Sequence, residues 1–123
     1  MGRPRKIEKA KESITIRLTI ADYEAVNNIA ISRRLPLSPF ITSMFAEKGC
    51  LDHKISDEEY ENLLKRPEMM QIVSQQIPKE NRRLCGFWIT TEEKKSLTYH
   101  AVVNCKCSMS VFVNKTILEL IGK

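Results

Sequence analysis

The chain has 123 residues, of which 42% are hydrophobic and 28% charged, and its formal net charge is +5 at pH 7. These values are ordinary for a soluble globular protein and suffice for one domain, or for two small lobes that share a core. No apolar run approaches the roughly 18–20 residues that span a bilayer, and no signal peptide opens the chain. We therefore expect a cytoplasmic protein without a membrane partner, whose four cysteines stay reduced.

The basic excess is concentrated at the N-terminus, where residues 1–12 (MGRPRKIEKAKE) have no hydrophobic periodicity. We interpret them as a flexible basic arm. The sequence Gly2-Arg3-Pro4 followed by basic residues resembles an AT-hook core, whose extended arginines lie in a narrow A·T minor groove. The alternative is a generic basic tail attracted to phosphate. Both interpretations have Arg3, Arg5 and Lys6 contact nucleic acid, and we assign these three residues to its phosphate backbone.

The clearest strand pattern is residues 13–19, SITIRLT, in which Ile14, Ile16 and Leu18 alternate with polar residues. That period is typical of a half-buried β-strand. A lone strand is not stable in water, because its backbone groups and its apolar face both need a partner. We therefore expect a second strand elsewhere in the chain.

Two helices are predicted after this strand. Thr19 can cap the first one, with Asp22 three residues on as in a capping box, and the helix should extend to about Arg34. The two prolines in residues 35–39 should break it, because neither fits a helix interior. A second helix should end at Gly49, and its apolar stripe consists of Phe40, Ile41, Met44 and Phe45.

Residues 50–81 form a spacer in which acidic residues predominate at first. Ser56 is a good start for a helix, and Pro67 either interrupts that helix or opens another short one. One interpretation is a helical connector packed on the rest of the protein. The other is a docking surface for a partner protein, formed by the methionine-containing piece around Met69 and Met70.

The opening pattern returns from residue 82. Residues 84–90 can be aligned with 13–19, with Thr90 as the new helix cap, and Leu97 and Ala101 match Val26 and Ala30. The match predicts an internal duplication of about 37 residues, 13–49 and 82–123. Inward positions of the second copy are Cys85, Phe87 and Ile89 in the strand, and Phe112, Val113, Thr116 and Ile117 in the last helix.

This doubled strand-helix-helix order resembles the ribbon-helix-helix (MetJ/Arc) family of DNA-binding proteins. Residues 14–19, 26–30 and 40–41 carry the resemblance in the first copy, and residues 87–90, 97–101 and 108–113 carry it in the second. The family is ordinarily a homodimer whose two strands pair antiparallel and enter the major groove. The resemblance implies a mainly α protein with one two-stranded antiparallel β-ribbon, in which strand 13–19 pairs with strand 84–90. The two copies would form one compact domain, a pseudo-dimer within one chain.

The resemblance also implies the site. Outward strand residues read bases, so Arg17 would contact guanine and Thr15 a base or a thymine methyl. The second strand departs from this polar pattern, since its outward residues are Leu84, Gly86 and Trp88. It would read DNA shape or apolar groups, or contribute little to base reading. The alternative is that the basic arm or the spacer covers Trp88.

The family holds phosphate at the start of each second helix, and Ser108 and Ser110 match that pattern in the second copy. In the first copy Pro36 replaces the first serine and Pro39 removes a donor, so the clamp is expected on the second copy rather than the first. Plain helix capping is the alternative for these serines. The base-reading set is Ser13, Thr15, Arg17, Gly86 and Trp88, and the phosphate set beyond the arm is Ser38, Arg82, Arg83, Ser108 and Ser110.

For function, the resemblance implies sequence-selective binding of double-stranded DNA. Unequal copies give no reason for a palindrome, so the site should be asymmetric. Tandem single-chain members resemble accessory proteins of conjugative plasmids, which bind near the transfer origin and help the relaxase assemble. The expected partners are DNA and a relaxase or another transfer protein, with the chain monomeric in solution and several copies possible side by side on DNA. Alternatives are a transcriptional repressor, an antitoxin and a protein-interaction adaptor that does not bind DNA.

No cofactor, metal or catalytic site is expected. Cys105-Lys106-Cys107 lacks the paired spacing of a zinc site. No glycine-rich phosphate loop, nucleophile elbow or carboxylate pair is present in the sequence, so an enzyme is not expected.

Overall fold

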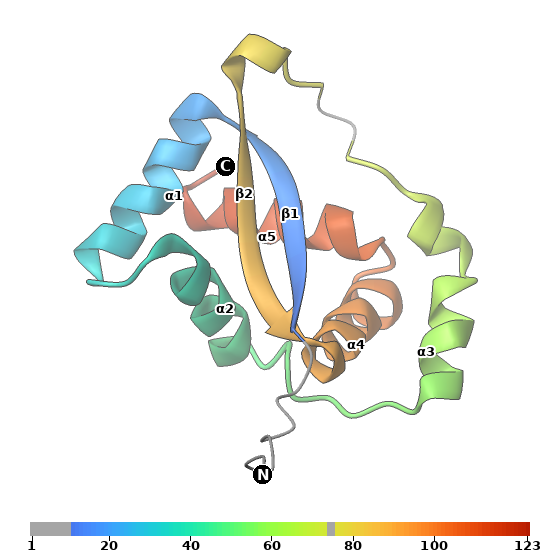
Figure 1. The fold of residues 1–123 in the computed structure, drawn as a ribbon. Helices are drawn as coiled ribbons and strands as arrows, with labels where there is room; N and C mark the ends of the chain where they lie inside the picture. The colour runs from blue at the N-terminus through green and yellow to red at the C-terminus, as the bar shows by residue number, and fades with distance from the viewer. Residues whose placement is uncertain (1–10, 74–75) are drawn as a thin grey trace, which may run out of the picture.

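The computed structural model describes residues 11–73 and 76–123. It is mainly helical, with one two-stranded antiparallel sheet (Figure 1). Strand β1 (Lys11–Thr19) precedes helices α1 (Ile20–Ser32) and α2 (Leu37–Glu47), and strand β2 (Arg82–Thr90) precedes α4 (Thr91–Tyr99) and α5 (Met109–Leu120). Helix α3 (Asp57–Leu64) lies between these halves of the chain. The arm residues Arg3, Arg5 and Lys6 lie outside the described residues.

The two strands pair as the sequence predicts. Ile14 faces Phe87 and Ile16 faces Cys85 on the inner side, while Arg17 faces Leu84 on the outer side. Both strands begin two residues earlier than the ranges 13–19 and 84–90. The polar start of β1 is held in the ladder because backbone pairing does not depend on side-chain polarity.

The predicted helix caps form at both strand ends. Thr19 Oγ1 accepts a hydrogen bond from the Asp22 N–H at 3.1 Å, and Thr90 Oγ1 accepts one from the Glu93 N–H, also at 3.1 Å. Only the second cap is a complete capping box, since Glu93 reaches back to the Thr90 N–H at 2.8 Å. The carboxylate of Asp22 is instead paired with Lys123 at 2.7 Å. A box at Thr19 would need the longer side chain of Glu or Gln.

The break between α1 and α2 is shorter than the range 35–39. Helix α2 starts at Leu37, so Pro39 lies in its first turn. Proline is tolerated there because the first turn has no intrahelical acceptor for its N–H. After α4, a wide π turn over His100–Asn104 extends the helix as far as its C-cap at Cys105. Gly49 ends α2 with a φ of +74°, as expected for a helix C-terminus.

The main core lies between the inner face of the ribbon and the helices that pack on it. Phe45 of α2 stacks on Phe87 of β2, with ring centroids 5.4 Å apart, and both are buried. A smaller cluster, Ile55, Leu63 and Val102, attaches the spacer to the end of α4. The Lys95 ammonium group reinforces this attachment by pairing with Asp57 of α3. Among the described residues, no helix has both the length and the apolar composition to cross a membrane.

Candidate nucleic-acid interface

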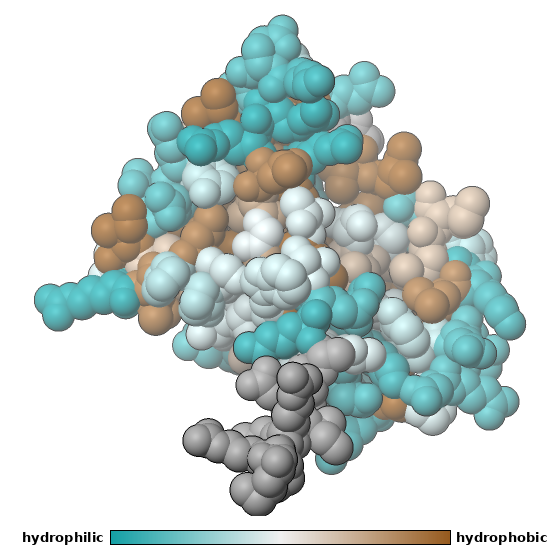
Figure 2. Space-filling model, in the orientation of Figure 1, coloured by the Kyte–Doolittle hydropathy of each residue, from teal (hydrophilic) through white to brown (hydrophobic). Residues whose placement is uncertain are grey.

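The outer face of the ribbon points away from the helices, which lie behind and beside it in Figure 1. In the same view, Figure 2 shows a band of weakly polar residues over the ribbon, with hydrophilic residues toward its ends. Alternation along each strand determines which side chains lie on this face. They are Lys11, Ser13, Thr15 and Arg17 from β1 and Arg82, Leu84, Gly86 and Trp88 from β2.

This face carries positive charge without compensation. Lys11, Arg17 and Arg82 lie on it, and the described salt bridges include none of the three. The only carboxylate in the two strands is Glu12, which alternation places on the inner side, where it pairs with Lys94 at 3.2 Å. The outer face of the ribbon therefore has a net positive charge among the described residues.

In the middle of the outer face, the β1 side chains are polar and short. Ser13 and Thr15 are exposed, and their hydroxyl oxygens lie 3.4 Å apart. Gly86 faces Thr15 across the ribbon, and a Cβ on it would come within 3.5 Å of the Thr15 hydroxyl. That is ordinary contact distance, so alanine would fit without strain. Because glycine has no side chain, the Thr15 hydroxyl stays accessible on the side that faces β2.

The β2 half is apolar. Trp88 is 55% exposed and Leu84 is 63% exposed, so the spacer does not cover either side chain. The backbone of Trp88 is fixed by α2, because its N–H donates to Ser38 Oγ at 3.2 Å and its C=O accepts from Thr42 Oγ1 at 3.0 Å. The exposed indole therefore stands on a rigid base.

The residues predicted to contact phosphate lie in different environments. Ser108 is buried and caps α5, accepting a hydrogen bond from the Val111 N–H at 3.2 Å. Arg83 lies over the ring of Tyr23 at 4.8 Å, at the flank of α1. Ser38 already accepts the Trp88 N–H, whereas Ser110 is exposed at the start of α5. Exposure thus favours Ser110 over Ser108 as a phosphate contact.

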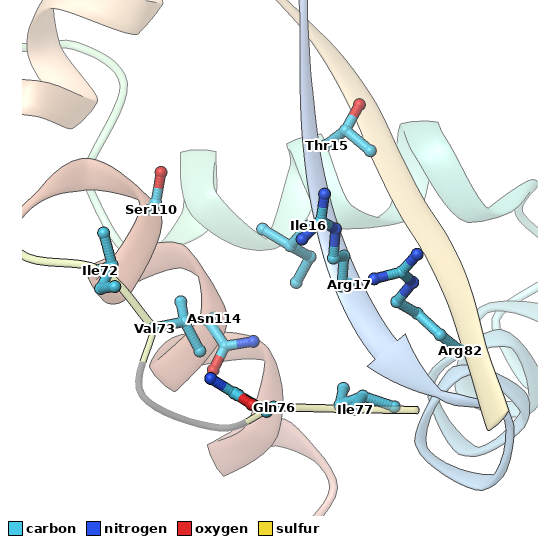
Figure 3. A pocket seen from close by; sticks show the side chains of 10 residues that line it. All are labelled: Thr15, Ile16, Arg17, Ile72, Val73, Gln76, Ile77, Arg82, Ser110 and Asn114. Carbon is cyan, nitrogen blue, oxygen red and sulfur yellow. The ribbon is translucent and has the colours of Figure 1, made fainter. Parts of the chain in front are cut away.

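Arg17, Arg82 and Ser110 come together around one cavity of about 640 Å³ (Figure 3). It lies between β1, α5 and the end of the spacer, and we call it the β1 cavity. No sequence pattern predicts this cavity, since the path of the spacer carries no sequence signal. Lys11 and Thr42 also lie outside the predicted site, although extending the alternation of β1 by one step would have revealed Lys11. The cavity is lined by Thr15, Ile16, Arg17, Ile72, Val73, Gln76, Ile77, Arg82, Ser110 and Asn114.

The cysteines and histidines do not form a metal site within the part of the chain that the structure describes, where no three metal-ligating side chains come together. Burial raises the pKa of the Cys85 thiol to about 11 and also raises the pKa of Cys50 and Cys107. Thiols with raised pKa values are poor nucleophiles, because the thiolate is the reactive form.

A scan of protein-family models and searches of curated proteins and of solved structures found no match to this chain. Function is therefore inferred from the geometry and chemistry of the ribbon alone.

Proposed function

We propose that the protein binds double-stranded DNA through the outer face of the β1–β2 ribbon, as two ribbon-helix-helix motifs fused into a pseudo-dimer. The main support for this proposal is the composition of the outer face, which has three cations, exposed hydroxyls and no carboxylate. The inner face of the same ribbon packs on the core. Each strand has nine residues, so the ribbon is about 30 Å long, and two strands about 5 Å apart fit a major groove about 12 Å wide. The order β1-α1-α2 followed by β2-α4-α5 supports the pseudo-dimer.

The two strands divide the reading of bases. Arg17 donates a bidentate pair of hydrogen bonds to guanine, and the hydroxyls of Ser13 and Thr15 bond neighbouring base edges. On β2, the indole of Trp88 and the side chain of Leu84 contact thymine methyl groups, which are the apolar features of the major groove. Since the two strands present different chemistry, the preferred site is not a palindrome.

The backbone contacts come from the ends of the ribbon. Lys11 and Arg82 lie at opposite ends of the outer face, as the register places Lys11 beside Thr90 and Arg82 beside Thr19. They neutralise phosphates on the two sides of the groove, and Ser110 adds a donor at the start of α5.

For the biological role, we propose an accessory protein of plasmid transfer, which fits an asymmetric site and the resemblance of tandem members to such proteins. Transcriptional repression is the alternative. DNA footprinting on the region around the protein's own gene separates them: protection beside a transfer origin supports the first, and protection over a promoter alone supports the second.

The proposal is tested by fluorescence anisotropy on a duplex selected from a random pool, over a series of salt concentrations. If Lys11 and Arg82 each neutralise one phosphate, the slope of log K against log salt is about −2 or steeper. Arg82→Ala should reduce the slope by about 0.9. Lys65→Ala removes an exposed charge at the C-cap of α3, which stands apart from the ribbon in Figure 1, and should leave the slope unchanged. Absence of binding at every salt concentration would refute the proposal.

A further inference from the structure

The two outer edges of the ribbon differ. At the β2 edge, Ser38 and Thr42 of α2 bind both backbone groups of Trp88, at 3.2 and 3.0 Å. The N–H and C=O of Trp88 therefore point away from β1 and toward α2. A strand edge covered in this way cannot pair with another chain at that residue.

The register extends this result to β1. Trp88 faces Ser13, and because its hydrogen-bonding groups point away from its partner, these two residues form a non-hydrogen-bonded pair of the ladder. Pairs alternate along an antiparallel ladder, so Thr15 and Arg17 belong to pairs of the same kind. Their N–H and C=O groups point outward from the β1 edge.

That edge faces the β1 cavity. Thr15, Ile16 and Arg17 are consecutive and their side chains alternate between the two faces, yet all three line the cavity. A cavity reached by three consecutive strand residues must lie along the edge of the strand. The outward backbone groups of Thr15 and Arg17 are thus directed into it.

Helix α5 does not close the β1 edge as α2 closes the β2 edge. Ser110 and Asn114 are the second and sixth residues of α5, as Ser38 and Thr42 are of α2. Ser110 and Asn114 line the cavity instead (Figure 3). Asn114 is only 8% exposed, and its side-chain amide has no hydrogen-bond partner among the residues that the structure describes. Asn114 is not among the described residues with a fully buried unpaired polar atom, so its amide keeps access to the cavity and can donate to and accept from an occupant.

The walls of the cavity indicate the chemistry of that occupant. Arg17 and Arg82 contribute two guanidinium groups, and none of the lining residues is acidic. Ile72 and Ile77 contribute an apolar wall. The volume of about 640 Å³ is within the range of ligand-binding cavities. The occupant should therefore be anionic, partly apolar, and able to donate and accept hydrogen bonds in alternation.

We propose that the β1 cavity binds an extended acidic peptide segment of a partner protein, which adds to β1 as a third strand. Its main chain pairs with the N–H and C=O groups of Thr15 and Arg17, and this mode of recognition is common at exposed sheet edges. Its carboxylates pair with Arg17 and Arg82, and a peptide group satisfies Asn114. A single nucleic-acid strand fits less well, because phosphates accept hydrogen bonds but donate none to the carbonyls of β1. Competition between this peptide and duplex DNA for Arg17 rests on the proposed function; peptide binding itself does not.

The test begins with a random heptapeptide phage-display library, panned in parallel against the full chain and against Asn114→Leu. We expect enrichment of peptides that combine Asp or Glu with β-branched residues on the wild-type chain, and at least tenfold weaker binding of the synthetic peptide to Asn114→Leu. Thr42→Val is the matched control at the closed edge and should bind the peptide like the wild type. A peptide N-methylated at alternate amides removes main-chain donors without altering the protein, and it should not bind.

Nuclear magnetic resonance locates the peptide. The backbone amides of Thr15 and Arg17 and the side-chain amide of Asn114 should shift and gain protection from hydrogen exchange. The proposal is overturned if the enriched peptides bind Asn114→Leu equally well, if these amides do not respond, or if a hexathymidylate strand shifts them while no peptide does. Peptide binding is measured without DNA, so its failure is distinct from a failure of duplex binding. Asn114→Leu should still bind duplex DNA.

Discussion

Substitution of Arg17 by alanine tests the base-reading role most directly. Arg17 is exposed on the outer face opposite Leu84, and no described salt bridge contains it. Its removal creates no cavity and leaves no buried partner unpaired, so the free energy of unfolding should change by no more than about 0.5 kcal/mol. A change in DNA binding would therefore report on the interface and not on folding.

The expected magnitude follows from the geometry of the guanidinium group. A bidentate contact to guanine contributes about 1–3 kcal/mol of discrimination at one base pair, which is about 5- to 150-fold in affinity. The assay is fluorescence anisotropy with the selected duplex and with duplexes that carry single G·C to A·T changes. At one position, the base-pair change should lower the affinity of the wild type by about this factor. Arg17→Ala should bind the selected duplex and that changed duplex with equal affinity.

Arg17→Lys is the conservative control. It keeps the charge but lacks the planar fork, so it should keep the salt dependence of the wild type and lose the discrimination. If Arg17→Ala instead weakens binding to all duplexes by the same factor, and flattens the salt slope by about 0.9, then Arg17 contacts a phosphate and the reasoning is refuted.

Three further predictions concern other parts of the molecule. Replacing thymine by uracil within the selected site removes a methyl group and should weaken wild-type binding about fourfold at the position that contacts Trp88; a uracil effect of equal size in Trp88→Ala would contradict this. Phe45→Ala removes a fully buried ring that stacks on Phe87, so urea unfolding should show a loss of about 3–5 kcal/mol; a loss below about 1 kcal/mol would mean that the core closes around the cavity. The Lys95 ammonium group holds the pKa of Asp57 below its usual 3.8, so this pair stabilises the fold above that pH, and the contribution is lost as the pH falls through the lowered value. Asp57→Asn should therefore lose less free energy of unfolding than the wild type as the pH falls through this range. An equal loss in both proteins would show that the pair does not contribute.

Local signals in the sequence were sufficient for the elements and for much of the core. The alternation of Ile14, Ile16 and Leu18 predicted which face of β1 is buried, because a strand places successive side chains on opposite sides. The caps at Thr19 and Thr90 were predictable since a hydroxyl satisfies free N–H groups of the first helical turn. The antiparallel pairing of the two strands was predictable from the doubled pattern and the family resemblance, not from either strand alone.

The closure of one ribbon edge and the opening of the other were decided by tertiary structure. Ser38 and Ser110 occupy the same position in their helices, yet Ser38 binds the backbone of β2 while Ser110 borders a cavity. The difference arises from how closely α2 packs on β2 and α5 packs on β1, which no local sequence pattern encodes. For the same reason the Asn114 amide borders the cavity, whereas Thr42, at the same helix position, binds the backbone of β2. The sequence thus determined which residues the outer face presents, and only the packing of α2 and α5 determined which edge of the ribbon stays open.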